Sequence, residues 1–246
     1  MIDPISPPGG WGGQKPPSGV QVNRLHPSSA GLIDAFVFNE QAGGNTRSAL
    51  TGEPLTLAGA AKWGACQQGS GVVTAASGDY LASAVTNKYQ IVGDEPFSAG
   101  VVVNSTGINE VYPGLMACRS TITEGAWWFY STTPSLHVAF SYRAAGTSYM
   151  LQWTAVYPGV GYHSFFIVKR PGATLELFVD GASKGVKTIS TMPVAGNHPL
   201  CVGTSSTSAP LYATFGTYLA AYLWRRALAA HEPAALHTQP YLMFGE

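Results

Sequence analysis

The chain has 246 residues, a length that suits one large all-β domain or two small domains. Only 11% of the residues are charged, and thirteen basic residues balance thirteen acidic ones. Without a basic stripe to neutralise phosphates, this composition argues against nucleic-acid binding. The sequence holds no run of about 18 apolar residues, so it predicts no membrane-spanning helix.

The first 24 residues are predicted to form an extended arm, and residues 25–246 to form one β-sandwich domain. Residues 1–20 contain five prolines and five glycines, a composition that excludes a helix or a central strand. Such an arm needs a surface to hold it, either its own domain or a neighbouring subunit, and we favour the neighbour. The residues expected to dock the arm on a partner are Pro7, Pro8, Trp11, Pro16 and Pro17.

Short segments of β-strand character follow one another from residue 31 onward. They lie at 31–40, 54–64, 69–85, 97–104 and 135–143. Within 136–143, apolar residues at even positions alternate with polar or small residues at odd positions, which is the period of a half-buried strand.

Residues 163–186 predict two hairpins that share a strand. Pro171-Gly172 occupies the centre of the first turn, as a type II turn requires, and Asp180-Gly181 forms the second. Many short strands with regularly spaced turns predict an all-β fold, a two-sheet antiparallel β-sandwich of the jelly-roll type.

One short helix is expected near the end of the sequence, within residues 225–239. It should begin at Ala230 or His231, with Pro233 in its first turn, where the missing proline N–H does no harm. It should end before Pro240, which cannot continue it.

The most conspicuous motif is the aromatic run TEGAWWFYST at residues 123–132. In a strand, Trp127 and Phe129 point to one face and Trp128 and Tyr130 to the other, so the run predicts a strand inside a sheet with both faces at least partly covered. Core packing is the main interpretation. The alternative is that one pair lines a sugar-binding groove. The candidate glycan-binding residues are Trp127, Trp128, Tyr130, His137 and Arg143.

The sequence offers no convincing catalytic constellation, so we predict a protein that is not an enzyme. A glycosidase needs two carboxylates about 5–10 Å apart. Asp94 and Glu95 are adjacent and therefore face opposite ways. Glu176 and Asp180 share a face, but Asp180 is needed by its turn. The segment HEPAALH places His231 and His237 six residues apart, which breaks the zinc-protease spacing. No catalytic residue, metal site or cofactor is predicted, although calcium binding on a loop stays open.

The three cysteines, Cys66, Cys118 and Cys201, are widely spaced and odd in number. Three buried free thiols are favoured over one disulfide plus a spare thiol, which suggests a reducing compartment.

Two segments resemble laminin G-like domains of the concanavalin A-like lectin/glucanase superfamily. The first is HPSSAGLIDAFVFNEQAGG at 26–44, supported by SGDYLAS at 77–83. The second lies in the C-terminal half, and its matching positions are His163, Val179-Asp180-Gly181, Gly203, Phe215-Gly216, Arg226-Ala227-Leu228, Glu232 and Leu236. The resemblance covers roughly 26–239 and implies the fold more strongly than any activity.

The resemblance also has departures. The family usually has a glutamate in the strand TYLAAYLW at 217–224, which is uncharged here. We interpret this as a surface strand adapted to contact another protein. Where the helix usually begins with serine, this chain has Ala229, so a typical N-cap is missing.

The leader KPPSGVQVNRLHP at 15–27 is similar to the entry of laminin G-like proteins encoded by bacteriophages and prophages. That resemblance implies a structural component of a virion, either a capsid decoration protein or a tail-associated protein. It would be made in the host cytoplasm, since the arm lacks the pattern of a signal peptide. Its partners would be the major capsid or tail protein, with many copies or a homo-oligomer on the particle. The alternative function is a lectin-like module that binds host or environmental glycans.

Overall fold

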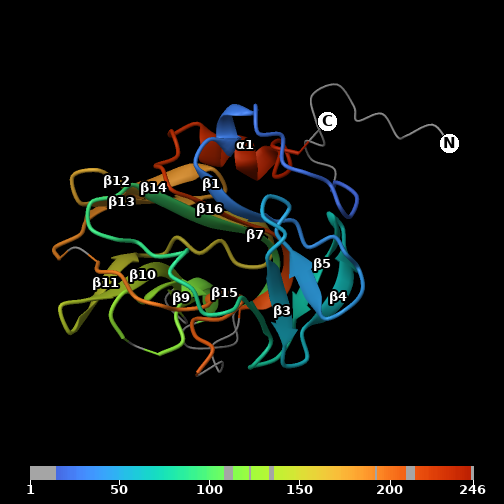
Figure 1. The fold of residues 1–246 in the computed structure, drawn as a ribbon, viewed down its shortest axis with the longest axis horizontal. Helices are drawn as coiled ribbons and strands as arrows, with labels where there is room; N and C mark the ends of the chain where they lie inside the picture. Colours follow the sequence, from blue (N-terminus) through green and yellow to red (C-terminus); the bar gives the residue numbers. More distant parts are fainter. Residues whose placement is uncertain are drawn as a thin grey trace.

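The computed structural model describes residues 15–107, 113–121, 123–132, 136–191, 193–208 and 214–244. Within these ranges the chain forms two eight-stranded antiparallel sheets that pack face to face (Figure 1). A short 3-10 helix (Pro27–Ser29) and the helix α1 (Glu232–Thr238) lie on the outer side of the first sheet. The predicted two-sheet β-sandwich with a short C-terminal helix is confirmed.

The first sheet has the strand order β14-β13-β12-β7-β16-β5-β4, with β1 also paired to β16. Its strands are β1 (Leu32–Phe36), β4 (Lys62–Cys66), β5 (Gly69–Thr74), β7 (Phe97–Gly107), β12 (Gly161–Arg170), β13 (Thr174–Val179), β14 (Ala182–Thr188) and β16 (Phe215–Trp224). The connections that join these strands pass repeatedly to the second sheet, as expected of a jelly roll.

The second sheet has the order β11-β10-β9-β8-β15-β6-β3-β2. Its strands are β2 (Asn45–Arg47), β3 (Pro54–Ala58), β6 (Tyr80–Ala82), β8 (Gly114–Cys118), β9 (Trp127–Thr132), β10 (His137–Ala144), β11 (Thr147–Trp153) and β15 (Leu200–Val202). The aromatic run forms β9, which lies inside this sheet between β8 and β10, as predicted.

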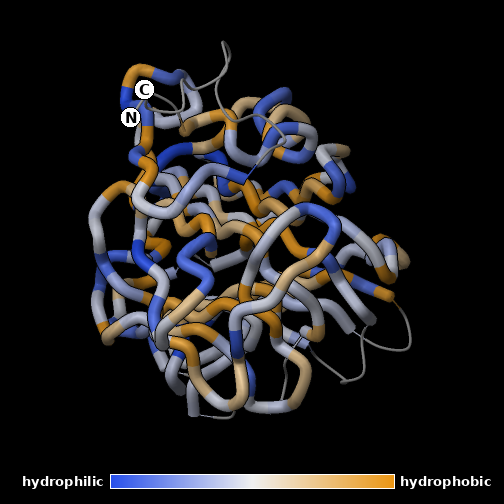
Figure 2. The backbone as a smooth tube through the Cα atoms, turned by 90° about the vertical axis from the view of Figure 1, so that its right-hand side faces the viewer, coloured by the Kyte–Doolittle hydropathy of each residue, from blue (hydrophilic) through white to orange (hydrophobic). Residues whose placement is uncertain are grey.

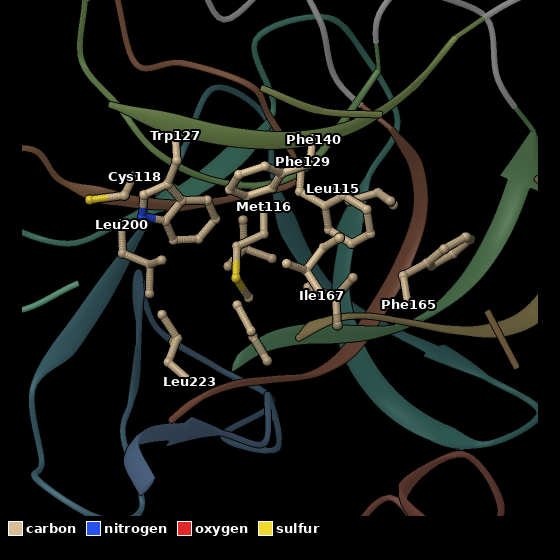
Figure 3. Close-up of a cluster of buried hydrophobic side chains, with 14 of the residues drawn as sticks. Leu115, Met116, Cys118, Trp127, Phe129, Phe140, Phe165, Ile167, Leu200 and Leu223 are labelled. Atoms are coloured by element: carbon tan, nitrogen blue, oxygen red, sulfur yellow. The ribbon is translucent and has the colours of Figure 1, made fainter. Parts of the chain in front are cut away.

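The main core fills the space between the two sheets. Trp127 is stacked on Phe140 with ring centroids 6.0 Å apart and meets Phe97 edge-on at 5.6 Å. Side chains from the second sheet point toward Ile167 and Leu223 of the first sheet (Figure 3). The most hydrophobic stretches accordingly run through the interior strands (Figure 2). Burying each large side chain contributes about 1.5–3 kcal/mol, so this cluster dominates the stability of the fold.

A second apolar cluster covers the outer face of the first sheet. Leu236 of α1 and the following segment, including Tyr241 and Phe244, pack on Tyr222 and Trp224 of β16. Both faces of β16 are therefore buried, since Tyr218 and Leu223 belong to the main core. The expectation that residues 217–224 form a partner-binding surface is wrong. The strand lacks charge because it is the covered centre of a sheet.

The part of the arm that the structure describes packs on its own domain. The Asn39 side-chain amide donates to the Pro16 and Pro17 carbonyls at 2.9 and 2.8 Å. Val22 forms a β-bridge with Phe244. Residues 15–24 therefore have a docking surface within the chain, and docking on a neighbouring subunit stays a prediction. The docking residues Pro7, Pro8 and Trp11 lie outside the described residues.

The local turn and helix predictions are confirmed. Gly172 has φ of +82°, and Asp180 and Gly181 have φ of +53° and +75°. These left-handed conformations are the reason for proline-glycine and aspartate-glycine at the two turns. Helix α1 begins after His231, which makes no side-chain capping bond.

All three cysteines are free, with Cys118 and Cys201 buried and Cys66 half-buried. Across the described ranges, no helix is long and apolar enough to cross a membrane.

Candidate functional site

Strand β9 sends its aromatic side chains to opposite faces of the second sheet. Trp127 and Phe129 enter the core, and the Trp127 indole N–H donates to the Tyr89 carbonyl at 2.8 Å. Trp127 is only 1% exposed, so it is not placed to contact a ligand. Of the two tryptophans named as glycan-binding candidates, only Trp128 lies on the outer face, where it is half-buried.

Trp128 lies in a row of side chains that crosses the second sheet. The strand register sets Trp128 opposite Ala117 of β8 and Ser141 of β10, and Ser141 opposite Met150 of β11. Arg119 and Arg143 lie in the neighbouring row, on either side of Ala126, whose carbonyl accepts from the Arg143 backbone N–H at 2.8 Å. We call this surface the outer platform, and it consists of Arg119, Trp128, Tyr130, Ser141, Arg143 and Met150.

The two central groups of the outer platform are a guanidinium and an indole in contact. The Arg119 Cζ lies 4.3 Å from the centre of the Trp128 ring, within the range of a cation–π interaction. Since an arginine side chain stays charged at all ordinary pH values, this contact fixes a permanent positive charge against the aromatic surface.

Tyr130 supports the outer platform from beneath. It is 5% exposed, and its hydroxyl lies 3.2 Å from the Ser141 Oγ and 3.1 Å from the Met150 Sδ. Met150 is 56% exposed. Tyr130 therefore holds neighbouring side chains in place, and only a small part of its ring can meet a ligand.

Arg143 supplies a second guanidinium on the same face. Its Nη1 donates to the Ser148 Oγ at 3.3 Å. Within the described part of the chain Arg143 makes no ion pair. The nearby Glu124 instead accepts from the Gly146 backbone N–H through its Oε1 at 2.6 Å. The charge of Arg143 is thus available to an incoming anion.

His137 lies at the far end of β10, away from the other candidates. A strand rises about 3.4 Å per residue, so His137 is roughly 20 Å from Arg143. Its Nδ1 accepts from the Ala155 backbone N–H at 3.0 Å. The structure therefore brings Trp128, Tyr130 and Arg143 together, but it does not bring His137 into the same site.

Sequence reasoning missed Arg119 and Met150. Arg119 follows a strand that the pattern of apolar residues did not reveal, because β8 is the uninterrupted apolar run GLMAC, with all five residues buried. Its outward direction follows only from the β8–β9 register, which sets Cys118 opposite Trp127.

A separate cluster joins serine, histidine and aspartate on the first sheet. His163 Nδ1 lies 2.9 Å from Asp180 Oδ2, while His237 Nδ1 lies 3.1 Å from Ser164 Oγ and 3.8 Å from Asp180 Oδ1. In a catalytic triad the serine and the acid contact different ring nitrogens. Here Ser164 and Asp180 both face Nδ1 of His237, so the cluster attaches α1 to the sheet.

The same contacts shift two pKa values. Burial favours a lower pKa for His163, but the hydrogen bond and charge of Asp180, with the Val160 carbonyl, raise it above its usual value. Burial favours a higher pKa for Asp180, but His163, the Ser164 backbone N–H and the charge of His237 lower it. The pair is thus stabilised in its charged form.

Groups of three or more potential metal ligands are absent from the described residues. The buried carboxylate of Asp79 instead accepts backbone N–H groups from Ala60, Ala75 and Ala76 at 2.7 to 3.0 Å. Asp79 therefore organises the turn before β6.

Comparison with known proteins finds relatives in structure alone. No protein-family model and no curated protein sequence matches the chain. The CBM40 of the Ruminococcus gnavus IT-sialidase, bound to α2,3-sialyllactose, is 16% identical, and the match covers 58% of this chain and 83% of that chain with a TM-score of 0.50.

Two toxin domains match over more of the chain. The binding domain of Paraclostridial mosquitocidal protein 1 is 9% identical, over 85% of this chain and 52% of that one, with a TM-score of 0.62. The botulinum neurotoxin serotype G binding domain is 11% identical, over 84% and 50%, with a TM-score of 0.61. This chain spans about half the length of these toxin domains. At such identities the likeness shows the fold alone, a two-sheet β-sandwich.

Proposed function

We propose that the chain is a carbohydrate-binding protein that holds glycans on the outer platform and prefers sugars with an acidic group. The observation that carries this proposal is the juxtaposition of one half-exposed indole and two guanidinium groups on a single sheet face. The chain is neutral and poor in charge, yet two of its arginines lie beside a surface tryptophan. This combination of groups suits an acidic sugar.

Each part matches a part of such a ligand. A sugar ring has an apolar C–H face, and the electron-rich face of an indole is complementary to its C–H groups. A carboxylate or sulfate on the sugar matches the planar fork of an arginine, which forms two parallel charge-assisted hydrogen bonds. Arg143 is the guanidinium that has no acidic partner within the described residues, so we assign it the acidic group.

The fold is compatible with this proposal. The similar structures include a carbohydrate-binding module with sialyllactose bound and two toxin binding domains. Their identities of 9 to 16% transfer the fold and not the ligand, so the geometry of the outer platform has to carry the specificity.

A glycan array tests the proposal. The array should display sialylated, uronic-acid-containing, sulfated and neutral glycans. We expect the wild-type chain to bind a subset of the acidic glycans, and Trp128→Ala to lose that binding. Trp63→Ala is the matched control, because Trp63 is a half-buried tryptophan on β4 of the other sheet. Binding that survives Trp128→Ala, or is lost equally in both variants, would contradict the proposal.

A further inference from the structure

A cavity lies on the side of the molecule opposite the outer platform, on the outer face of the first sheet. It has a volume of about 360 Å³ and lies between the end of α1 and the β4–β5 turn. Gln68, Tyr162, His237 and Tyr241 are among the residues that line it. This volume is at the lower end of the range for small-molecule sites, about 300–1,000 Å³. We call it the C-terminal cavity.

Two tyrosine rings and an imidazole supply its flat walls. The Tyr162 and His237 rings are tilted by 40° with centroids 5.4 Å apart, and the Tyr162 hydroxyl donates to the His237 carbonyl at 2.9 Å. Tyr241 is 1% exposed and packs in the apolar cluster beneath. These contacts make the walls rigid before any ligand arrives, which reduces the entropy lost on binding.

The polar groups around the C-terminal cavity retain hydrogen-bonding capacity. The Nδ1 of His237 faces Ser164 and Asp180, which leaves Nε2 as the ring nitrogen that can meet a ligand. The Tyr241 hydroxyl is buried and has no hydrogen-bond partner among the described residues. Because this hydroxyl is buried, it does not face the cavity, and the hydrogen-bonding groups left for a ligand are His237 Nε2 and the Gln68 amide.

The charges near the C-terminal cavity are engaged by the protein itself. Asp180 accepts from His163 and from the Ser164 backbone N–H. The Lys15 ammonium donates to the Ser70 and Leu219 carbonyls. Among the described residues, a ligand in the cavity therefore meets aromatic rings, an imidazole nitrogen and an amide.

We propose that the C-terminal cavity binds one neutral sugar ring. Aromatic walls suit the C–H face of such a ring, and the Gln68 amide and His237 Nε2 suit its hydroxyl groups. This second site goes beyond the acidic-glycan function proposed for the outer platform, from which it is separated by both sheets. The chain would thereby engage two different sugars with two opposite faces.

A titration followed by NMR tests this second site independently of the first. Methyl glycosides of glucose, galactose, mannose and N-acetylglucosamine are added to ¹⁵N-labelled full-length chain. The side-chain amide signal of Gln68 is followed together with the backbone amide signals of Thr238 and Tyr241, which also line the cavity and remain in a Gln68 variant. We expect a saturable shift with at least one of these sugars. Gln68→Ala should weaken the binding about fivefold, as expected for the loss of one hydrogen bond.

Two controls separate the possible results. Gln67→Ala alters the exposed neighbour of Gln68 in the same turn and should leave the affinity unchanged. Trp128→Ala should also leave it unchanged. The proposal is overturned if no sugar shifts the Gln68 signal up to the solubility limit, or if Gln67→Ala and Gln68→Ala weaken binding equally. It is also overturned if Trp128→Ala abolishes the shift, because the sugar would then bind at the outer platform.

Discussion

The guanidinium of Arg119 lies 4.3 Å from the centre of the Trp128 indole ring, although Arg119 directly follows β8 and Trp128 belongs to β9. The contact limits the rotamers of both side chains, so the ring is held in one orientation on the sheet. One face of the indole is engaged by Arg119, and Trp128 is half-buried, so a ligand can contact only the part of the ring that stays exposed.

Arg143→Ala should weaken the binding of acidic glycans by about tenfold or more. A hydrogen bond to a charged group contributes about 1.5–3 kcal/mol, and 1.4 kcal/mol is a factor of ten in the dissociation constant. Calorimetric titration with an acidic oligosaccharide measures the change, and the affinity should also fall as salt is raised.

Arg24→Ala is the control for that titration, since Arg24 is exposed and remote from the second sheet. Equal losses in both variants would indicate a general effect of net charge and would remove the special role of Arg143.

Trp127 and Trp128 should differ sharply in their effect on stability. Trp127→Ala empties a core position and breaks the bond to the Tyr89 carbonyl, so it should lower the free energy of unfolding by about 3–5 kcal/mol. Trp128→Ala should lower it by about 1 kcal/mol. Urea denaturation followed by circular dichroism measures both, and equal losses would mean that Trp128 is a core residue as well.

Much of the fold could be predicted because local patterns and packing agree. The alternation of apolar and polar residues in 136–143 predicts which side of β10 enters the core. The Asp180-Gly181 turn can be predicted because aspartate and glycine both tolerate positive φ. The aromatic run predicted both its strand and the division of its side chains. In each case the information lies within a few residues of the feature.

The site could be predicted only in part because it depends on register between strands that are distant in sequence. The contact between Arg119 and Trp128 depends on the pairing of β8 with β9, and no local sequence pattern predicts that pairing. For the same reason the uncharged β16 was mistaken for a partner-binding surface. Nothing within residues 217–224 shows that α1 and the C-terminal segment cover their outer face.

The pair of His163 and Asp180 predicts a pH dependence of stability. The pKa of His163 is raised, so its contribution is complete below the unfolded value of about 6.5 and is lost as pH rises through the folded value. The pKa of Asp180 is lowered, so its contribution is present above about 3.9 and is lost as pH falls through the folded value. The pair therefore stabilises most between about pH 4 and 6.5.

His163→Gln should reveal this window. The difference in unfolding free energy between wild type and variant should be about 0.5–1 kcal/mol larger at pH 5.5 than at pH 8.5. His231→Gln is the control, because His231 makes no side-chain capping bond. A difference that is independent of pH would contradict the assignment.

Gly181→Ala should weaken the attachment of α1 to the sheet. A Cβ at Gly181 would lie 2.6 Å from the Ala234 Cα, at a φ of +75°. Gly172→Ala is the control, because Gly172 has a similar φ of +82° but open space where a Cβ would lie. Its loss of stability therefore measures the cost of the backbone conformation alone, about 1 kcal/mol. Thermal unfolding should show a clearly larger loss of stability for Gly181→Ala than for Gly172→Ala. Equal losses would mean that α1 moves to accommodate the added Cβ without loss of stability.

The virion location suggested by the N-terminal leader stays a prediction. Residues 15–24 pack on their own domain, but Pro17 among them is exposed, so docking of the arm on a capsid or tail protein stays a prediction. Glycan binding and a place on a particle are compatible, since a surface-mounted lectin-like domain could do both.

The most direct test of the central claim uses the two adjacent tryptophans as signal and internal control. The indole N–H resonances of Trp127 and Trp128 are assigned in a ¹⁵N-labelled chain, and an acidic glycan from the array is titrated in. If the outer platform is the binding site, the Trp128 resonance moves saturably and the Trp127 resonance, buried and bonded to the Tyr89 carbonyl, stays in place. If the glycan binds while the Trp128 resonance does not move, the site lies elsewhere and the account is wrong.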